Sequence, residues 1–261
     1  RGDPRLHPGE IGRHSVDIMT ALQTQKSSDD SVGSESTPAV IYEVIRGRII
    51  SGNIPAGSEL AQARVAEEFG VSRAPVREAF RLLQREGLIV AAVNLRARVS
   101  DLSAEEVDHL YALRVVNEAL ALRVSIPRFT EQELRRLREL AAQIANSRPD
   151  NFDEWEQLHE QFHHLLISHC GPSLESSLAQ WSDLTERYRR VYVADRSGGW
   201  TLGSREHLLL AQQCSDRDCD GAVGTLAGHL GRAGLTLVGQ IDPQYEAVLV
   251  QGALAQVIPG Q

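Results

Sequence analysis

Two histidines four residues apart, His159 and His163, have the spacing in this chain that most directly suggests chemistry. They stand in the run H-E-Q-F-H, within a segment whose apolar spacing predicts a helix from about residue 152 to 169. Side chains at positions i and i+4 of a helix share one face, so two imidazoles at this spacing can bind one metal ion. The sequence therefore predicts a metal site that begins on this helix.

An alternative interpretation of the same five letters is a zinc peptidase, in which Glu160 would act as the general base. The extended peptidase signature needs a glycine three residues after the second histidine, and this chain has Leu166 there. His169 would therefore stay on the continuing helix and point away from the pair. The methionine turn of such enzymes is also missing, because the only methionine, Met19, lies far upstream. These absences favour a binding site over a hydrolase.

An all-α bundle is expected to position the two histidines. The capping sequences S-A-E-E from Ser103 and T-E-Q-E from Thr130 each predict the start of a helix. Further helices are expected at residues 152–169, 174–193, 204–214 and 218–240, separated by glycine and proline breakers. The pattern predicts a domain of about six helices over residues 103–241 and leaves a C-terminal extension, 242–261, without an assignment.

A second informative segment lies upstream, at residues 65–88, where two short helices joined by a turn predict a helix-turn-helix. Ser72 is a natural N-cap and Pro75 falls in the first helical turn, so the second helix begins at Arg73. Its apolar residues recur at helical spacing and should face the core: Val76, Phe80 and Leu83, with Leu88 just beyond. A helix at 41–50 and short strands from residue 88 and at 96–99 would complete a winged helix.

The opposite face of this second helix is cationic, with an arginine at every fourth position from 73 to 85. Because the first turns of a recognition helix meet base edges, Arg73 and Arg77 are expected to contact guanine. Arg81 and Arg85 are expected to meet phosphates or an acidic neighbour such as Glu78. The full set of expected DNA-binding residues is Arg64, Ser72, Arg73, Ala74, Arg77, Arg81 and Arg96.

Charge is divided unevenly along the chain. The 261 residues carry a formal net charge of −8, which is unusual for a protein that binds nucleic acid. Residues 38–100, however, contain nine arginines and six glutamates, so this part carries +3 and the remainder −11. A modestly basic domain joined to a strongly acidic one fits a regulator of which only one half contacts DNA.

The runs I-I-S-G-N-I-P-A-G-S-E-L and F-G-V-S-R-A-P-V-R-E-A-F-R-L-L-Q-R-E-G-L resemble the DNA-binding domain of the GntR family of bacterial transcription regulators. The resemblance covers roughly residues 40–99 and implies a winged helix-turn-helix domain, which we assign to residues 38–102. Arg96 stands where the family usually has a wing-tip glycine, and Ala63, beside Arg64, stands where an arginine is common. An arginine at the wing tip can itself enter a narrow minor groove.

The run L-H-E-Q-F-H-H-L-L-I-S-H-C-G-P-S-L resembles the all-α FCD effector-binding domain that accompanies this type of DNA-binding domain, over roughly residues 101–240. That domain commonly holds a metal through an aspartate, a histidine four residues later and two further histidines. The resemblance implies that the ligands here are His159, His163, His207 and His229, with His159 in place of the aspartate. Loss of the carboxylate charge favours borderline divalent ions, zinc or nickel above all, over manganese.

The resemblance also implies a small organic acid as the effector, bound beside the metal. Arg114 is the candidate for neutralising its carboxylate, and an ion pair with Glu118 is the alternative role for that arginine. Further candidates for the pocket wall are Tyr111 and Asn117 and, less directly, Arg187 and Tyr188.

Together these features predict a mainly α protein, with an N-terminal winged helix-turn-helix and a C-terminal all-α bundle. It is expected to act as a sequence-specific bacterial transcription regulator, in the first instance a repressor and not an enzyme. A homodimer bound to an inverted-repeat operator, with its affinity changed by the effector, is the expected mode of action. A regulator of the same kind whose bundle binds no metal is the alternative.

The remaining segments suggest no further chemistry. Residues 1–37 contain little that could form a core and are expected to be a disordered tail. No apolar run approaches the ~20 residues of a membrane helix and no secretory signal pattern is present, so a cytoplasmic location without a membrane partner is expected. Three cysteines, at positions 170, 214 and 219, lack paired spacing and are expected to be reduced.

Overall fold

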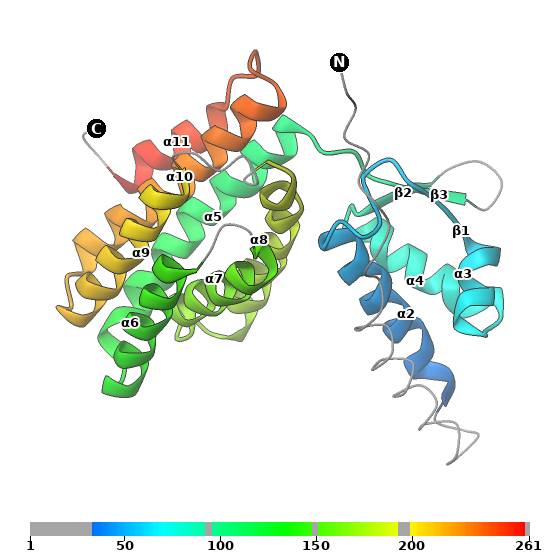
Figure 1. The fold of residues 1–261 in the computed structure, drawn as a ribbon, viewed down its shortest axis with the longest axis horizontal. Helices are drawn as coiled ribbons and strands as arrows, with labels where there is room; N and C mark the ends of the chain where they lie inside the picture. The colour runs from blue at the N-terminus through cyan, green and yellow to red at the C-terminus, as the bar shows by residue number, and fades with distance from the viewer. Residues whose placement is uncertain (1–32, 92–95, 148–150, 193–198, 259–261) are drawn as a thin grey trace. The chain divides into compact units, whose positions relative to one another are not determined.

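The computed structural model describes residues 33–91, 96–147, 151–192 and 199–258. The described residues separate into two compact units: those of 33–47 and 59–98 form one, and those of 48–58 and from 99 onward form the other. The first contains a small sheet and the second is helical (Figure 1). The predicted fold class is therefore confirmed, whereas the exact domain boundaries stay a prediction.

The N-terminal unit is a winged helix-turn-helix. Its elements in chain order are α2 (Gly33–Ile50), β1 (Glu59–Ala61), α3 (Gln62–Phe69), α4 (Arg73–Arg85), β2 (Ile89–Ala91) and β3 (Arg96–Val99). The strands form one sheet in the order β1-β3-β2, and β1 pairs antiparallel with β3. Strand β1 was not predicted from the sequence, because its three residues, E-L-A, include no β-branched or aromatic residue typical of a strand.

The turn between α3 and α4 depends on Gly70, which adopts a left-handed conformation with φ of 64°. Glycine has no Cβ to oppose this conformation, and the turn N–H groups bond back to the last carbonyls of α3. Helix α4 begins at Arg73 as predicted, although the Ser72 side chain makes no capping hydrogen bond. The predicted apolar face is buried, and Ala79 joins it: Val76, Ala79, Phe80 and Leu83, with Leu88 beyond the helix.

Two expectations for this unit need correction. Helix α2 begins at Gly33, so residues 33–37 belong to a helix and not to the tail; residues 1–32 lie outside the described part of the chain. Arg96 is the first residue of β3, paired in register with Ala61, and is not at the wing tip. The connection between β2 and β3, residues 92–95, lies outside the described residues.

The second unit is an all-α bundle. Its elements are α5 (Ala104–Ser125), the short 3-10 helix η2 (Ile126–Arg128), α6 (Glu131–Asn146), α7 (Phe152–Ile167), α8 (Pro172–Tyr192), α9 (Gly199–Ser215), α10 (Cys219–Ile241) and α11 (Val248–Val257). Thr130 and Glu133 form the predicted reciprocal capping box of α6, and Ser103 caps α5 by accepting from the Glu106 N–H. None of the helices in the described ranges is long and apolar enough to cross a membrane. The three cysteines form no disulfide among the described residues.

Helix α5 is the centre of this bundle and packs against α7, α8, α10 and α11. Glycines allow the closest approaches: a Cβ on Gly234 of α10 would lie 2.7 Å from the Tyr111 Cβ, and one on Gly231 would lie 2.6 Å from a Leu254 methyl group. Two differences from the predicted pattern stand out. Helix α7 ends at Ile167, two residues early, and α11 lies in the extension that the sequence left without an assignment.

Candidate metal centre and DNA-binding surface

Four imidazoles from three helices meet in the interior of the bundle. His159 and His163 come from α7, His207 from α9 and His229 from α10. Each can offer one ring nitrogen such that all four nitrogens lie within 4.8 Å of one another. The Nε2 atoms of His163 and His207 are 3.3 Å apart. The structure thus brings together the four residues that the FCD resemblance implies as ligands.

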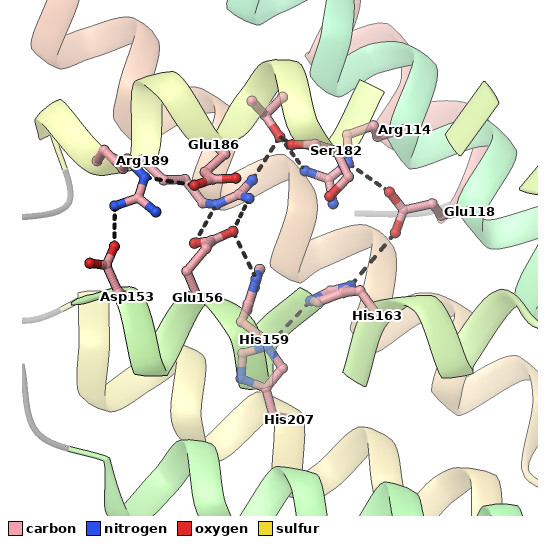
Figure 2. A network of polar contacts seen from close by, with 12 residues as sticks. Arg114, Glu118, Asp153, Glu156, His159, His163, Ser182, Glu186, Arg189 and His207 are labelled. Carbon is pink, nitrogen blue, oxygen red and sulfur yellow. Dashed lines mark hydrogen bonds and ion pairs between the residues drawn. The ribbon is translucent and has the colours of Figure 1, made fainter. Parts of the chain in front are cut away.

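Carboxylates lie behind three of these imidazoles. The Nδ1 of His229 is 2.8 Å from Glu206 Oε2, that of His163 is 3.7 Å from Glu118 Oε2, and that of His159 is 3.9 Å from Glu156 Oε1. Figure 2 shows Glu118 and Glu156 on the side of His163 and His159 away from His207. None of these glutamates was identified from the sequence as a partner of a histidine, although Glu118 was expected as the alternative partner of Arg114. Only the i, i+3 spacing of Glu156 and His159 gave a local signal, because the other two contacts join different helices.

The four imidazoles are held neutral. Burial lowers the pKa of His163 and of His229 to about 4, and nearby cationic side chains contribute. Burial followed by the neighbouring imidazoles also lowers the pKa of His159 and His207 well below its usual range. A neutral imidazole keeps a nitrogen lone pair for a metal. At neutral pH this cluster is therefore a set of neutral nitrogen donors, three of them buried.

The donor set and its spacing fit a borderline divalent ion. Tetrahedral zinc with Zn–N bonds of about 2.0–2.1 Å separates its nitrogens by roughly 3.3 Å, which matches the distance between the Nε2 atoms of His163 and His207. Four neutral nitrogens suit zinc or nickel better than magnesium, calcium or manganese, which prefer oxygen.

Two buried arginines hold the neighbouring carboxylates. Arg114 donates from Nε to Glu118 at 2.6 Å and from Nη1 to Thr185 at 2.8 Å. Arg189 also donates to Thr185, at 2.7 Å, and forms a two-point contact with Glu156. Burial alone would raise the pKa of the Glu118 carboxyl, but the Arg114 guanidinium lowers it to about 2. The Glu118 carboxylate is therefore charged, and both carboxylates are paired with an arginine (Figure 2).

A small cavity lies beside His163, between α5, α7 and α8. It is lined by Arg114, Glu118, Glu160, His163, His164, Ile167, Leu178, Ala179, Ser182 and Asp183. Its volume of about 30 Å³ is enough for about two water molecules, since one needs roughly 10–15 Å³. An organic acid would therefore enter only if lining side chains moved.

The candidate effector residues are distributed differently from the expectation. Arg114 lines the cavity and also makes the ion pair with Glu118 that was its alternative role. Tyr111 is buried against α10, and the Asn117 amide donates to the Leu113 carbonyl of its own helix. Neither of these two side chains lines the cavity described above. Their role in effector binding stays a prediction without a contact that supports it.

Two further histidines near the end of α7, His169 and His164, do not join the cluster. His169 follows the end of α7, where its Nε2 is 3.0 Å from Glu133 and its ring packs edge-on against Phe129. His164 is exposed and lies 3.1 Å from Glu175. The expectation that His169 points away is confirmed, although the helix ends before it.

The predicted DNA-binding face of the N-terminal unit is exposed. Solvent reaches Arg64 on α3, Ser72 in the turn, Arg96 on β3 and the α4 residues Arg73, Ala74, Arg77, Arg81 and Arg85. Arg81 pairs with Glu78 at 2.8 Å, as the sequence suggested, and Arg96 pairs with Glu59 at 2.8 Å. Behind this face, Glu86 binds Tyr42 and Arg46 and so ties the end of α4 to α2.

Comparison with family models covers both units. Residues 38–99 match the model described as bacterial regulatory proteins of the gntR family, and residues 109–232 match the FCD domain. The HTH-type transcriptional regulator YdhC of Bacillus subtilis is 30% identical over 210 residues, which are 77% of this chain and 92% of that protein. The transcriptional repressor RspR of Escherichia coli is 28% identical, over 73% of this chain and 84% of its own.

Solved structures agree on the fold. The structure of E. coli McbR/YncC superposes with a TM-score of 0.67 at 19% sequence identity, covering 78% of this chain and 98% of that one. A transcriptional regulator GntR from Rhodococcus sp. RHA1 gives a TM-score of 0.65 at 21% identity, over 81% of this chain. The matching family models and the relatives YdhC and RspR describe transcription regulators and not enzymes, which excludes the peptidase interpretation. The chain belongs to the GntR family of bacterial transcription regulators and is a DNA-binding regulator with a C-terminal FCD domain.

Proposed function

We propose that this regulator is controlled by a metal-dependent sensor in its FCD domain. A divalent ion, zinc or nickel, would be held by His159, His163, His207 and His229, and a small organic acid would bind beside it. The observation that carries the proposal is the convergence of four neutral imidazoles, three buried and that of His229 half-buried, next to a cavity that Arg114 lines. An ion that takes more ligands than the four imidazoles would have a position left for a carboxylate oxygen.

Arg114 supplies the second attachment point for such an acid. Its guanidinium lies in the wall of the cavity and is bound to Glu118 and Thr185. A carboxylate effector would compete with Glu118 for this guanidinium, because both offer oxygen acceptors in the same buried place. Effector binding therefore changes the partners of Arg114 and, with them, the contacts of α8.

Helix α8 connects this site to the segment that leads out of the DNA-binding domain. Thr185 accepts hydrogen bonds from the two arginines of the site. One turn further along α8, Arg187 donates to the Ser100 carbonyl at 2.7 Å, and the Tyr188 hydroxyl bonds Glu106 and accepts from the Ser103 N–H. The contacts of Arg187 and Tyr188 are thus with the residues around the start of α5, and neither side chain lines the cavity described above. A shift of α8 would be felt directly at residues 100–106.

On the DNA side, we infer that a homodimer places two α4 helices in successive major grooves, roughly 34–36 Å apart, on an inverted repeat. The contacts are assigned to Arg64, Ser72, Arg73, Ala74, Arg77, Arg81 and Arg96. By linkage, an effector that weakens operator binding must itself bind less well to the operator-bound protein. Repression relieved by the acid is the expected outcome.

A second candidate within the same class is a metal-free regulator. Two observations favour it: Arg114 and Glu118 already neutralise each other, and the cavity has room only for water. Such a protein would recognise its effector by side chains alone, after a larger rearrangement of the cavity.

Metal analysis of the purified protein separates the two candidates. The metal-dependent sensor requires a near-stoichiometric ion that is lost in His207→Ala but kept in His164→Ala, which removes an exposed histidine outside the cluster. In a parallel thermal-shift screen, an organic acid should stabilise only the protein without chelator. Stabilisation by acids regardless of chelator would support the metal-free candidate.

An Arg187→Gln variant tests the connection through α8. The acid should stabilise this variant as it stabilises the wild type, but the operator affinity of the variant should respond less to the acid.

A further inference from the structure

We propose that Glu206 is a positioning residue for the metal, holding the Nδ1 side of His229 so that its Nε2 faces the ion, and that Glu118 and Glu156 take the same role toward His163 and His159 once the ion is bound. This inference rests on the metal site proposed above and assigns a role to three residues outside its ligand set. Such backing matters because an imidazole has two nitrogens, and the partner of one decides which of them carries the lone pair.

The contact between Glu206 and His229 is the strongest of the three. Glu206 Oε2 lies 2.8 Å from His229 Nδ1, which is a normal hydrogen-bond distance. A charged carboxylate only accepts hydrogen bonds, so Nδ1 must be the protonated nitrogen of His229 and Nε2 the one with the free lone pair. The ring of His229 lies 4.7 Å from that of His207 and 5.4 Å from that of His163, measured between centroids, so this lone pair belongs to a ring inside the cluster.

Glu118 and Glu156 repeat the arrangement at longer distances. Glu118 lies 3.7 Å from His163 Nδ1, and the Nε2 of the same ring already faces His207. Glu156 lies 3.9 Å from His159 Nδ1. Both separations exceed a hydrogen bond, so a rotation of each ring or carboxylate would be needed to close them. The effect of these two glutamates is accordingly expected to be smaller than that of Glu206.

Each of these carboxylates is itself held by an arginine, which gives the site a repeated pattern of imidazole, carboxylate and guanidinium. Arg232 pairs with Glu206, Arg114 with Glu118 and Arg189 with Glu156. The arginines occupy carboxylate oxygens that could otherwise turn toward the ion and become ligands. The pattern therefore keeps the donor set nitrogen-only.

Metal affinity of Glu206 variants tests the proposal with the full-length protein. Binding of Zn²⁺ is measured by competition with a chromophoric chelator, and binding of Co²⁺ by the visible absorption that reports its coordination. We expect Glu206→Ala to bind both ions about 10–100-fold more weakly than the wild type. Glu206→Gln keeps an acceptor, so its metal affinity should lie between those of Glu206→Ala and the wild type. The Co²⁺ spectrum of Glu206→Ala should differ from that of the wild type.

Glu175→Gln is the matched control, because Glu175 backs His164, a histidine outside the cluster, at 3.1 Å. It should leave the affinity and the Co²⁺ spectrum unchanged. The melting temperature of each metal-free variant shows whether the fold is retained, and Glu206→Gln serves if Glu206→Ala does not fold. A wild type that binds metal while both Glu206 variants bind it equally well would overturn this inference alone. A wild type that binds neither ion would overturn the proposed metal site as well.

Discussion

The recognition helix α4 and the histidine cluster both concentrate charged or titratable side chains, but in opposite surroundings. The arginines of α4 are exposed and lie on a single helix. The imidazoles and the carboxylates behind them are largely buried and come from α5, α7, α9 and α10. Water solvates the first set, whereas the second must be matched group by group because unpaired buried charge is costly. An arginine of α4 can thus be substituted without leaving a buried group unpaired. A substitution in the histidine cluster removes the partner of a neighbouring buried group.

The response to acid should separate the two regions most strongly. His163 and His229 have pKa values of about 4 in the folded protein, below the unfolded value of 6.5. The unfolded chain therefore takes up protons first as the pH falls, and stability present above pH 6.5 is lost progressively down to pH 4. Each of these two imidazoles accounts for on the order of 3 kcal/mol of the lost free energy of unfolding, at 1.36 kcal/mol per pKa unit. The N-terminal unit has no histidine between residues 33 and 98 and should not share this loss.

Tryptophan fluorescence measures this effect selectively. All three tryptophans, at positions 155, 181 and 200, lie in the C-terminal part of the chain. Urea midpoints taken with a chelator at pH 7, 5.5 and 4.5 should fall steadily, and added zinc should raise the midpoint at pH 7. A midpoint that stays constant from pH 7 to 4.5 would contradict the lowered pKa values.

Breaking a buried ion pair should have the next largest effect. Arg114→Met leaves Glu118 charged in the interior without its main partner, so the free energy of unfolding should fall by about 3–5 kcal/mol. The comparison is Arg81→Ala, which removes an exposed pair with Glu78 on α4 and should cost less than about 1 kcal/mol. Urea unfolding followed by circular dichroism measures both variants. Equal losses would show that burial does not govern the energetics of these pairs.

The same contrast explains which features could be predicted from the sequence alone. Signals contained in one helix were sufficient for α4, whose start at Arg73 and buried apolar face followed from spacing and turn residues. The capping box of Thr130 and Glu133 is equally local. The metal ligands on α9 and α10 came from the family resemblance, because nothing in the spacing of His207 and His229 relates them to α7.

Features that depend on tertiary contacts were missed. Helix α11 is capped by a residue of another helix, since the Asp108 carboxylate of α5 accepts hydrogen bonds from the N–H groups of Leu249 and Val250 at 3.2 and 2.8 Å. No N-cap signal at the start of α11 could reveal this. Glu206 likewise lies on α9 while the imidazole it holds lies on α10. Such partners become visible only when the helices are packed.

Base recognition by α4 should show a smaller but specific effect. Arg77 is exposed in the first half of the helix, where recognition helices meet base edges. Arg77→Ala should weaken binding to an operator selected from random DNA by about 1–3 kcal/mol and relax the sequence preference. Titrations with the selected and a scrambled duplex at one salt concentration measure both quantities. A variant that loses affinity for the two duplexes equally would place Arg77 on the phosphates.

The smallest expected effect belongs to Arg85, in the last turn of the same helix. Its distance from the N-terminus of α4 suits a phosphate contact, which carries no sequence information. Arg85→Ala should weaken specific and scrambled DNA alike and lower the salt dependence of binding by about one unit of slope. Gln84→Ala, an exposed and uncharged neighbour, is the control and should leave the slope unchanged. If Arg85→Ala instead alters sequence preference, the recognition face extends along the whole helix and the division between base and phosphate contacts is wrong.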